Sequence, residues 1–269
     1  MKVALVQSCA RQDPAANLDQ VLALAEQAIL AERPDLLVLP EVFALIATTP
    51  EQRRAVAETI PDGPICKALA DLARRHGITV HGGSLHERAE ADRAYNTTPV
   101  FGPDGQLITR YRKIHLFDVT TPDGRDYRES ATVAPGREVI SYRLGAWTVG
   151  CSICYDLRFP ELYQALARQG CDLLVVPAAF TLMTGKDHWE VLLRARAIET
   201  ACYVAAAAQW GRHDDSGRMS WGHSMVVDPW GHVIARASDG VGWTAARLDH
   251  GRVRQVRAQI PVHAHKVLP

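Results

Sequence analysis

The chain has 269 residues, its 30 lysines and arginines balance 30 aspartates and glutamates, and 47% of the residues are hydrophobic. This is the composition of an ordinary globular protein, and without a basic excess we expect no nucleic-acid partner. The longest apolar runs, such as 36–40 and 204–208, are far shorter than the roughly 20 residues of a membrane span, so we expect no membrane partner either. The run 3–6 predicts a first strand, not a signal peptide. The six cysteines are dispersed, which favours free thiols and a cytoplasmic protein.

The first elements predict a β-α-β unit. A short β-rich run at 3–7 precedes a segment, 17–32, with apolar residues at helical spacing, and Pro34 ends that helix. The run 35–40, Asp-Leu-Leu-Val-Leu-Pro, is continuously apolar after its aspartate. Such a run is typical of a strand that is buried on both faces.

A second unit of the same kind follows after residue 146. It comprises a strand at 147–153, a helix at 160–169 and a strand at 172–177, Asp-Leu-Leu-Val-Val-Pro. The closing hexapeptides of the two units nearly match. The match has two interpretations, an internal repeat of two α/β halves or a coincidence of strand composition.

The remaining pattern is also that of an α/β protein. The turn sequence at 102–105 joins two strands into a hairpin, the segment 118–135 lacks periodicity, a helix is expected at 189–200, and the tail 260–269 is irregular. No Ser/Gly-rich linker or charge run divides the chain, so we expect one α/β domain over 1–269 with helices on its outer faces. Further strands are expected at 78–84, 95–101, 107–111, 203–209, 224–228 and 233–237.

Three reactive side chains fall just beyond predicted strands, where α/β folds gather their active sites. Glu41 directly follows the run 35–40, and partial burial there would raise its pKa toward that of a useful base. Lys113 lies after the hairpin, and Cys154 follows the strand at 147–153. Each also has a structural interpretation: a surface or helix-start glutamate, a lysine on a solvated strand face, and a buried inert thiol.

The segment after Cys154 favours its interpretation as a nucleophile. Residues 155–159 turn into a helix whose Pro160 and Glu161 suit the first helical positions. A strand-to-helix turn of this kind exposes a nucleophile and directs backbone N–H groups, here that of Tyr155, toward a forming oxyanion. The remaining cysteines are interpreted as structural thiols: Cys9, Cys66, Cys171 and Cys202.

Cys151 and Cys154 also have the Cys-x-x-Cys spacing, which leaves a thiol redox protein as an alternative of a different functional class. Residues three apart in a strand point to opposite faces, and no second Cys-x-x-Cys or Cys/His pair in the sequence completes a tetrahedral metal site. The glycines lack the spacing of nucleotide-binding loops. We therefore expect no metal and no cofactor.

Taken together, three segments resemble the nitrilase superfamily of carbon–nitrogen hydrolases. They are Leu39-Pro40-Glu41, Arg112-Lys113-Ile114-His115 and Cys151-Ser152-Ile153-Cys154-Tyr155-Asp156. The resemblance extends from residue 3 to about residue 262. It implies a four-layer αββα sandwich and a homodimer formed through the helical faces, with the C-terminal tail as a candidate for reaching across to the partner.

The resemblance also implies residue roles. Cys154 is the expected nucleophile, Glu41 the general base, and Lys113 with the Tyr155 N–H the oxyanion donors. Glu129, in Arg128-Glu129-Ser130, matches a further family glutamate that steadies the lysine and the substrate. The candidates for substrate binding are Arg158, Phe180 and Thr181, with Arg212 and His213 as further groups for a substrate carboxylate.

Within the superfamily, the segments 188–200 and 222–231 resemble the branch of deaminated glutathione amidases and omega-amidases. This implies a small-molecule amide of a 2-oxo acid as the partner, hydrolysed through a thioester. The expected substrate is deaminated glutathione, which yields 2-oxoglutarate and cysteinylglycine. The alternative is omega-amidase activity on 2-oxoglutaramate or 2-oxosuccinamate.

Overall fold

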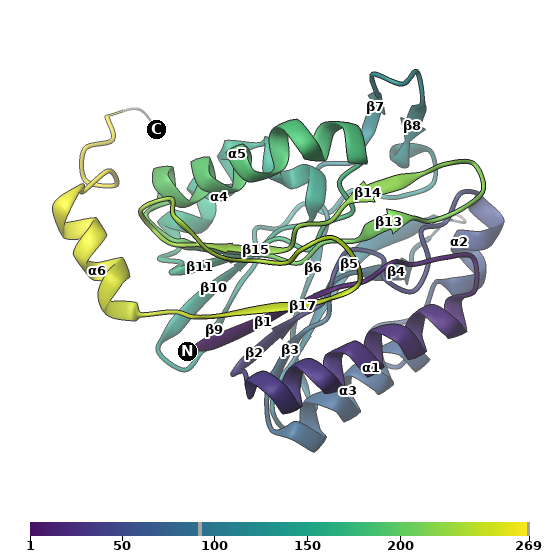
Figure 1. Ribbon diagram of the computed structural model, residues 1–269, viewed down its shortest axis with the longest axis horizontal. Coiled ribbons are helices and arrows are strands. Elements are labelled where there is room, and N and C mark those ends of the chain that lie inside the picture. Colours follow the sequence, from purple (N-terminus) through teal and green to yellow (C-terminus); the bar gives the residue numbers. More distant parts are fainter. Residues whose placement is uncertain (91–92, 268–269) are drawn as a thin grey trace.

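The protein has four layers in the order helix, sheet, sheet, helix (Figure 1). The computed structural model describes residues 1–90 and 93–267, so residues 268 and 269 of the tail predicted to be irregular lie outside the described residues. One outer layer is formed by α1 (Pro14–Glu32) and α3 (Pro64–His76), the other by α4 (Pro160–Arg168) and α5 (Leu182–Thr200). This arrangement is the αββα sandwich that the resemblance implies. Within the described ranges, no helix combines the length and the apolar character needed to cross a bilayer.

The first sheet has the strand order β17-β1-β2-β3-β5-β4, and β6 pairs with β5. Its parallel core is β1-β2-β3, and the hairpin β5-β6 is antiparallel, as the turn at 102–105 predicts. The strands are β1 (Lys2–Gln7), β2 (Leu36–Val38), β3 (Thr79–His81), β4 (Leu85–Arg88), β5 (Ala94–Phe101), β6 (Leu107–Arg112) and β17 (Gly242–Arg247).

Both faces of this sheet are buried, which explains its continuous apolar runs. Along β1, Ala4 and Val6 pack into the cluster beneath α1 and α3, whereas Val3 and Leu5 belong to the core between the two sheets. The period-2 alternation of a strand therefore distributes apolar side chains to two cores. Full burial of a valine or leucine side chain contributes about 1.5–3 kcal/mol to stability.

The second sheet has the order β16-β15-β12-β11-β10-β9. It is covered on its outer face by α4 and α5, and the predicted pairing of 224–228 with 233–237 is confirmed as β15-β16. The strands are β9 (Ser141–Leu144), β10 (Trp147–Cys151), β11 (Leu173–Val175), β12 (Tyr203–Ala206), β15 (Met225–Val227) and β16 (Val233–Arg236).

The two near-identical hexapeptides occupy equivalent positions in the two sheets. The first contains β2, between β1 and β3, and the second contains β11, between β10 and β12, and all four of these pairings are parallel. The structural repetition favours the interpretation of two α/β halves, each of which builds most of one sheet, with β17 added to the first sheet by the second half of the chain.

Two expectations about the chain between 118 and 200 are corrected by the structure. The segment 118–135 is not irregular throughout, because β7 (Asp118–Thr120) and β8 (Asp126–Arg128) form a hairpin that a 3-10 helix follows. The helix expected from residue 189 begins at Leu182. Its first turns contain Gly185, a poor helix former, but a Cβ there would lie 2.3 Å from the Trp221 Cβ, so close packing requires the glycine.

Several elements escaped the sequence analysis. The helix α3 has a strong signal, since Pro64 starts it and Gly77, in the left-handed region at φ +61°, ends it. The helix α6 (His250–Gln259) buries only Val253 and Val256, so its apolar pattern is weak. The other missed elements are short or at sheet edges: α2 (Pro50–Val56), β4, β9, β13 (Trp210–Arg212), β14 (Met219–Trp221) and β17.

Candidate active site

A cavity of about 420 Å³ lies where loops from both sheets meet. Its wall includes eight of the residues that the sequence analysis proposed for catalysis or substrate binding: Glu41, Lys113, Glu129, Cys154, Tyr155, Arg158, Phe180 and Thr181. The side chains thus come together from positions up to 140 residues apart in the sequence.

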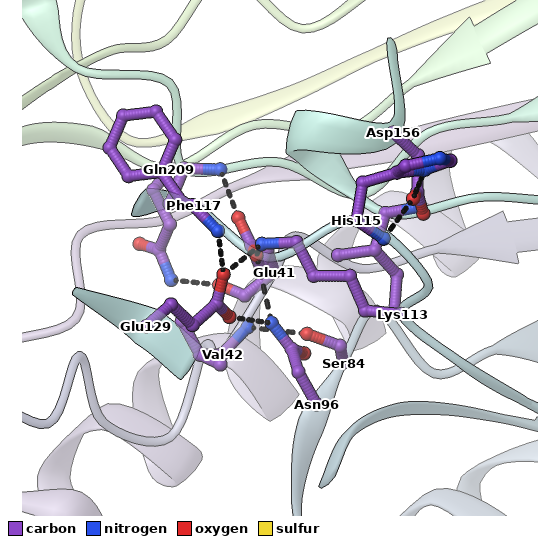
Figure 2. Close-up of polar contacts among 12 residues, drawn as sticks. Glu41, Val42, Ser84, Asn96, Lys113, His115, Phe117, Glu129, Asp156 and Gln209 are labelled. Atoms are coloured by element: carbon purple, nitrogen blue, oxygen red, sulfur yellow. Dashed lines mark hydrogen bonds and ion pairs between the residues drawn. The ribbon is translucent and has the colours of Figure 1, made fainter. Parts of the chain in front are cut away.

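Glu41 begins the turn after β2, and its surroundings fix both carboxylate oxygens (Figure 2). The Asn96 amide donates to Oε1 over 2.9 Å, and the Ala179 N–H donates to Oε2 over 2.8 Å. The next residue, Val42, has φ +41°, and its N–H donates to Ser84 Oγ over 3.0 Å. A bulky residue in the left-handed region is strained, and such strain is common at functional sites.

Lys113 follows β6, and only 2% of its side chain is exposed. Its Nζ lies 2.9 Å from Glu41 Oε1 and 2.9 Å from Glu129 Oε2, so the lysine bridges the two carboxylates (Figure 2). Burial alone would lower the pKa of Lys113, but the charges of Glu129 and Glu41 hold it well above its usual value. The lysine is therefore an ammonium ion at neutral pH.

Glu129 opens the 3-10 helix Glu129–Ala131 after the β7-β8 hairpin. Its Oε2 also accepts the Phe117 N–H over 2.7 Å, and its Oε1 accepts the Asn96 amide over 3.3 Å. Burial would raise the pKa of Glu129, but the ammonium of Lys113 and these donors lower it overall. Glu129 therefore stays ionised and fixes Lys113 from the side opposite Glu41.

Cys154 lies just beyond β10, at the start of the 3-10 helix Cys154–Arg158. Its backbone has φ +48°, and its N–H donates to Pro177 O over 2.9 Å. Burial raises the pKa of the thiol well above its usual value, the nearby Glu41 charge raises it further, and Lys113 opposes the shift. The resting thiol is therefore protonated. The amide groups that open a helix have no intrahelical partner, so the Tyr155 N–H is suited to donate a hydrogen bond to an anion.

Asp156, two residues after Cys154, ties the cysteine turn to the segment that follows Lys113. It is fully buried and accepts hydrogen bonds from the Ile153 N–H over 2.8 Å, the His115 N–H over 3.0 Å and the Tyr111 hydroxyl over 2.7 Å. The His115 Nδ1 lies 2.8 Å from the same carboxylate (Figure 2). Sequence analysis did not identify Asp156 or Asn96 as site residues, because their roles follow from contacts that the sequence does not display.

The buried charges of this cluster do not balance. Glu41 and Glu129 carry two negative charges against the single positive charge of Lys113. A thiolate at Cys154 would add a third negative charge in a low-dielectric site, where like charges repel strongly. Deprotonation of the thiol is therefore favoured only when its proton passes to a carboxylate as the new bond forms.

The outer wall of the cavity carries the groups proposed for substrate binding. The guanidinium carbon of Arg158 lies 5.3 Å from the centroid of the Phe180 ring. His213 also lines the cavity, but its ring nitrogens contact Ala10 O and Ser220 Oγ, both at 2.8 Å, and burial lowers its pKa. A neutral imidazole whose two nitrogens already have partners does not suit the role expected of His213, which was to bind a substrate carboxylate. Arg212 is not among the described residues of the wall, whereas Arg53, Arg128 and Arg218 are.

Cys151 does not face this cavity. It is fully buried in β10 within the core between the sheets, and burial raises its pKa. An inaccessible thiol of high pKa does not suit disulfide exchange. In the part of the chain that the structure describes, no cluster of three or more His, Cys, Asp or Glu side chains is arranged to hold a metal ion.

Comparison with known proteins agrees with this geometry. The carbon–nitrogen hydrolase family matches residues 2–258. A protein of Synechocystis sp. named deaminated glutathione amidase is 43% identical over 98% of this chain and 97% of its own. A Mus musculus omega-amidase is 39% identical over 98% of this chain and 94% of its own.

Solved structures show the same fold. Saccharomyces cerevisiae Nit3, described as a member of branch 10 of the nitrilase superfamily, aligns with a TM-score of 0.88 at 33% identity, covering 100% of this chain and 97% of that one. The chain therefore belongs to the carbon–nitrogen hydrolase family, in the deaminated glutathione amidase and omega-amidase branch of the nitrilase superfamily, and is a hydrolase of amide carbon–nitrogen bonds.

Proposed function

We propose that Cys154 is the nucleophile of this amidase, Glu41 its general base and acid, and Lys113 its main oxyanion donor. One observation carries this proposal: Lys113 Nζ lies 2.9 Å from both Glu41 and Glu129 in a cavity that also holds the strained turn of Cys154. Glu129 and Asn96 act as positioning residues, because their contacts in the described cluster are with Lys113 and Glu41.

In the acylation step, Glu41 accepts the thiol proton while the sulfur forms a bond to the amide carbonyl carbon. The carbonyl electrons move to oxygen, and the oxyanion is met by the Lys113 ammonium and the Tyr155 N–H. Removal of one such donor typically costs about 10²–10³-fold in rate. Glu41 then passes its proton to the amide nitrogen as the carbon–nitrogen bond breaks, which leaves a thioester on Cys154.

In the deacylation step, Glu41 removes a proton from water, whose oxygen attacks the thioester carbon. The second oxyanion uses the same donors, the carbon–sulfur bond breaks, and the thiolate recovers its proton from Glu41. General acid–base catalysis of this kind contributes about 10²–10⁴-fold.

We infer deaminated glutathione as the substrate, cleaved to 2-oxoglutarate and cysteinylglycine. Support comes from the Synechocystis relative of that name and from the size of the cavity, which at about 420 Å³ is in the range that binds ligands larger than a single amino acid. The second candidate is omega-amidase activity on 2-oxoglutaramate or 2-oxosuccinamate, which the Mus musculus relative favours.

The test compares deaminated glutathione with 2-oxoglutaramate, both of which release 2-oxoglutarate. Cys154→Ala serves as the blank, and rapid acid quenching of the wild type during turnover is used to capture the acyl-enzyme for mass spectrometry of the peptide that contains Cys154. A higher kcat/KM for deaminated glutathione supports the first substrate, and the reverse order supports the second. Equal product release from wild type and Cys154→Ala refutes the proposed nucleophile.

We further propose that this single domain forms a homodimer through the outer face of α5. Val191 and Ile198 on that helix are 66% and 52% exposed, and Trp230 and Ile234 nearby are also exposed. Exposed apolar side chains that group together are typical of interaction surfaces. Sedimentation equilibrium of the wild type and of Val191→Glu tests the pairing, and a monomeric wild type refutes it.

A further inference from the structure

The proposed reaction brings an anionic substrate to a cluster that is itself negative. Glu41, Glu129 and Lys113 sum to one negative charge, and a 2-oxo acid adds at least one more. Deaminated glutathione carries two carboxylates, one on each side of the scissile amide. Binding such a dianion requires cationic groups in the cavity wall that have no carboxylate of their own.

Arg53, on α2, is one such group. It lines the cavity, is partly buried, and its guanidinium donates to Thr132 Oγ1 and to Ala47 O, at 3.5 Å for the latter. Among the described residues it has no carboxylate in salt-bridge range, and its buried Nε has no hydrogen-bond partner. Burial lowers the pKa of Arg53, the charge of Glu129 opposes this shift, and Arg218 adds to it.

Arg218, just before β14, is the second group. It lines the same cavity and is partly buried, and its guanidinium carbon lies 5.6 Å from the centroid of the Tyr127 ring. Within the described part of the chain, its side chain forms no ion pair and no hydrogen bond. Arg53 and Arg218 are therefore two mutually repelling cations at one cavity, and both have unused N–H donors.

The other cationic side chains of the cavity wall already have a carboxylate partner or lie beside the acyl group. Lys113 is held between Glu41 and Glu129, and Arg128 pairs with Asp126 over 3.5 Å. Arg158 belongs to the same short helix as Cys154, so it stays beside the acyl group that the cysteine holds. An additional carboxylate must therefore be met by Arg53 and Arg218.

The course of the chain indicates which carboxylate this is. The wall is continuous from Glu41 to Arg53, since the cavity is lined by Val42, Ile46, Ala47, Thr48 and Pro50 between them. In the proposed mechanism Glu41 protonates the leaving amine, so the leaving group lies along this wall.

We propose that Arg53 and Arg218 form a subsite for the terminal carboxylate of the leaving group, and that this subsite makes the enzyme prefer amides whose amine product is an anionic peptide. This inference rests on the proposed function. Two guanidinium groups that have no carboxylate partner among the described residues suit bidentate binding of a carboxylate. The preferred substrate class is then a 2-oxo acid amide of a short peptide with a free C-terminus, ahead of a primary amide such as 2-oxoglutaramate.

The first experiment measures kcat and KM for both substrates with Arg53→Met and Arg218→Met. Methionine keeps much of the side-chain length but removes the charge and the donors. Each variant is expected to lose about 10- to 100-fold in kcat/KM for deaminated glutathione, mainly through KM, and to keep 2-oxoglutaramate turnover within about threefold of wild type. Lysine at either position is expected to restore part of the loss.

Matched controls separate this role from a loss of fold. Arg54→Met changes the next residue of α2, which pairs with Glu51 and does not line the described cavity, and Arg212→Met changes an exposed arginine near Arg218. Both controls are expected to behave as wild type on both substrates. Equal losses on the two substrates would show that the arginines act on the acyl side or on the fold, and unchanged kinetics with deaminated glutathione would also overturn the subsite.

A binding measurement keeps the inference testable if the proposed reaction fails. Calorimetry of Cys154→Ala with cysteinylglycine and with cysteinylglycine amide compares ligands that differ only in the terminal carboxylate. The acid is expected to bind about 10-fold or more tightly than the amide, and Arg218→Met is expected to abolish the difference. If the wild type cleaves neither substrate but the acid still binds more tightly than the amide, the subsite is supported and the proposed reaction is refuted. Equal binding of acid and amide overturns the subsite.

Discussion

Asp156→Asn is expected to destabilise the protein and to slow catalysis, because this buried carboxylate joins the segments that carry two of the proposed catalytic residues. The carboxylate faces the Ile153 N–H, the His115 N–H and ring, and the Tyr111 hydroxyl. Asparagine keeps only one carboxylate-type oxygen, so its NH2 group, placed where Oδ2 lies in Asp156, would face the Ile153 N–H and the Tyr111 hydroxyl. The Tyr111 hydroxyl can turn to accept, but the Ile153 N–H would lose its acceptor.

A buried donor without a partner costs about 1–3 kcal/mol, and replacing charged by neutral acceptors weakens the remaining bonds, so we expect a loss of about 2–4 kcal/mol. For a chain of this size that corresponds to a fall in Tm of about 4–7 °C. Because the turn of Cys154 loosens against Lys113, kcat should also fall roughly 10- to 100-fold at a temperature where the variant is folded.

The assay combines calorimetric melting with turnover of the better substrate. Asp118→Asn is the matched control, since Asp118 accepts hydrogen bonds from Ser130 but is exposed, and it should change the stability by less than about 1 kcal/mol. An Asp156→Asn variant with wild-type Tm and wild-type kcat would refute the argument that this carboxylate fixes the geometry of the site.

Three further predictions follow from other features of the structure. Gly83→Ala should reduce activity by roughly 100-fold, because the added Cβ would lie 2.1 Å from Pro40 O and displace Glu41. Gly77 has a similar φ but open space around it, so Gly77→Ala should cost only about 1–2 kcal/mol of stability and leave kcat unchanged. Equal kcat in both variants would contradict this. Burial lowers the pKa of His81 to about 3 from 6.5, so its neutral form stabilises the fold above pH 6.5, and about 2 kcal/mol of that stability is lost by pH 5 as the unfolded chain takes up the proton. Urea unfolding at pH 7.5 and pH 5 should show a smaller pH difference for His81→Leu than for wild type. Cys151→Ala should keep turnover within about threefold, because this thiol is buried in the core, and a complete loss of activity would instead favour the redox alternative.

The sequence alone could predict much of the fold, since long periodic segments and buried strands have strong local signals. The helix predicted over 17–32, which begins at Pro14 in the structure, the hairpin around 102–105 and both parallel units were recognisable in this way. Three-residue strands such as β13 and β14 were not, because they are defined by their pairing with each other and not by their own composition. The early start of α5 depends on Gly185 packing against Trp221, a tertiary contact that local propensity opposes.

For the site, position and chemical type made Glu41, Lys113 and Cys154 candidates, the family resemblance implied their roles and that of Glu129, and the structure brings all four into one cavity. Asn96 and Asp156 escaped because their importance comes from what they contact, which the sequence does not display. The same holds for Arg53 and Arg218. Arginines are common on surfaces, and only the geometry reveals that these two face a cavity without a carboxylate partner among the described residues.

The placement of the site across two sheets has a mechanical consequence. Glu41 and Lys113 follow strands of the first sheet, whereas Cys154 follows a strand of the second, so the separation of thiol and base depends on how far one sheet slides over the other. This sliding is restrained by the core in which Val38 and Val175 pack between the layers, and by the hydrogen bonds of Asp156 to Tyr111 and His115. Because closely packed interiors transmit strain, a lateral shift too small to disturb either sheet already changes the reacting distance. The rate of turnover should therefore depend on how the two sheets are aligned. During unfolding, we expect activity to be lost before the hydrogen bonds within either sheet break.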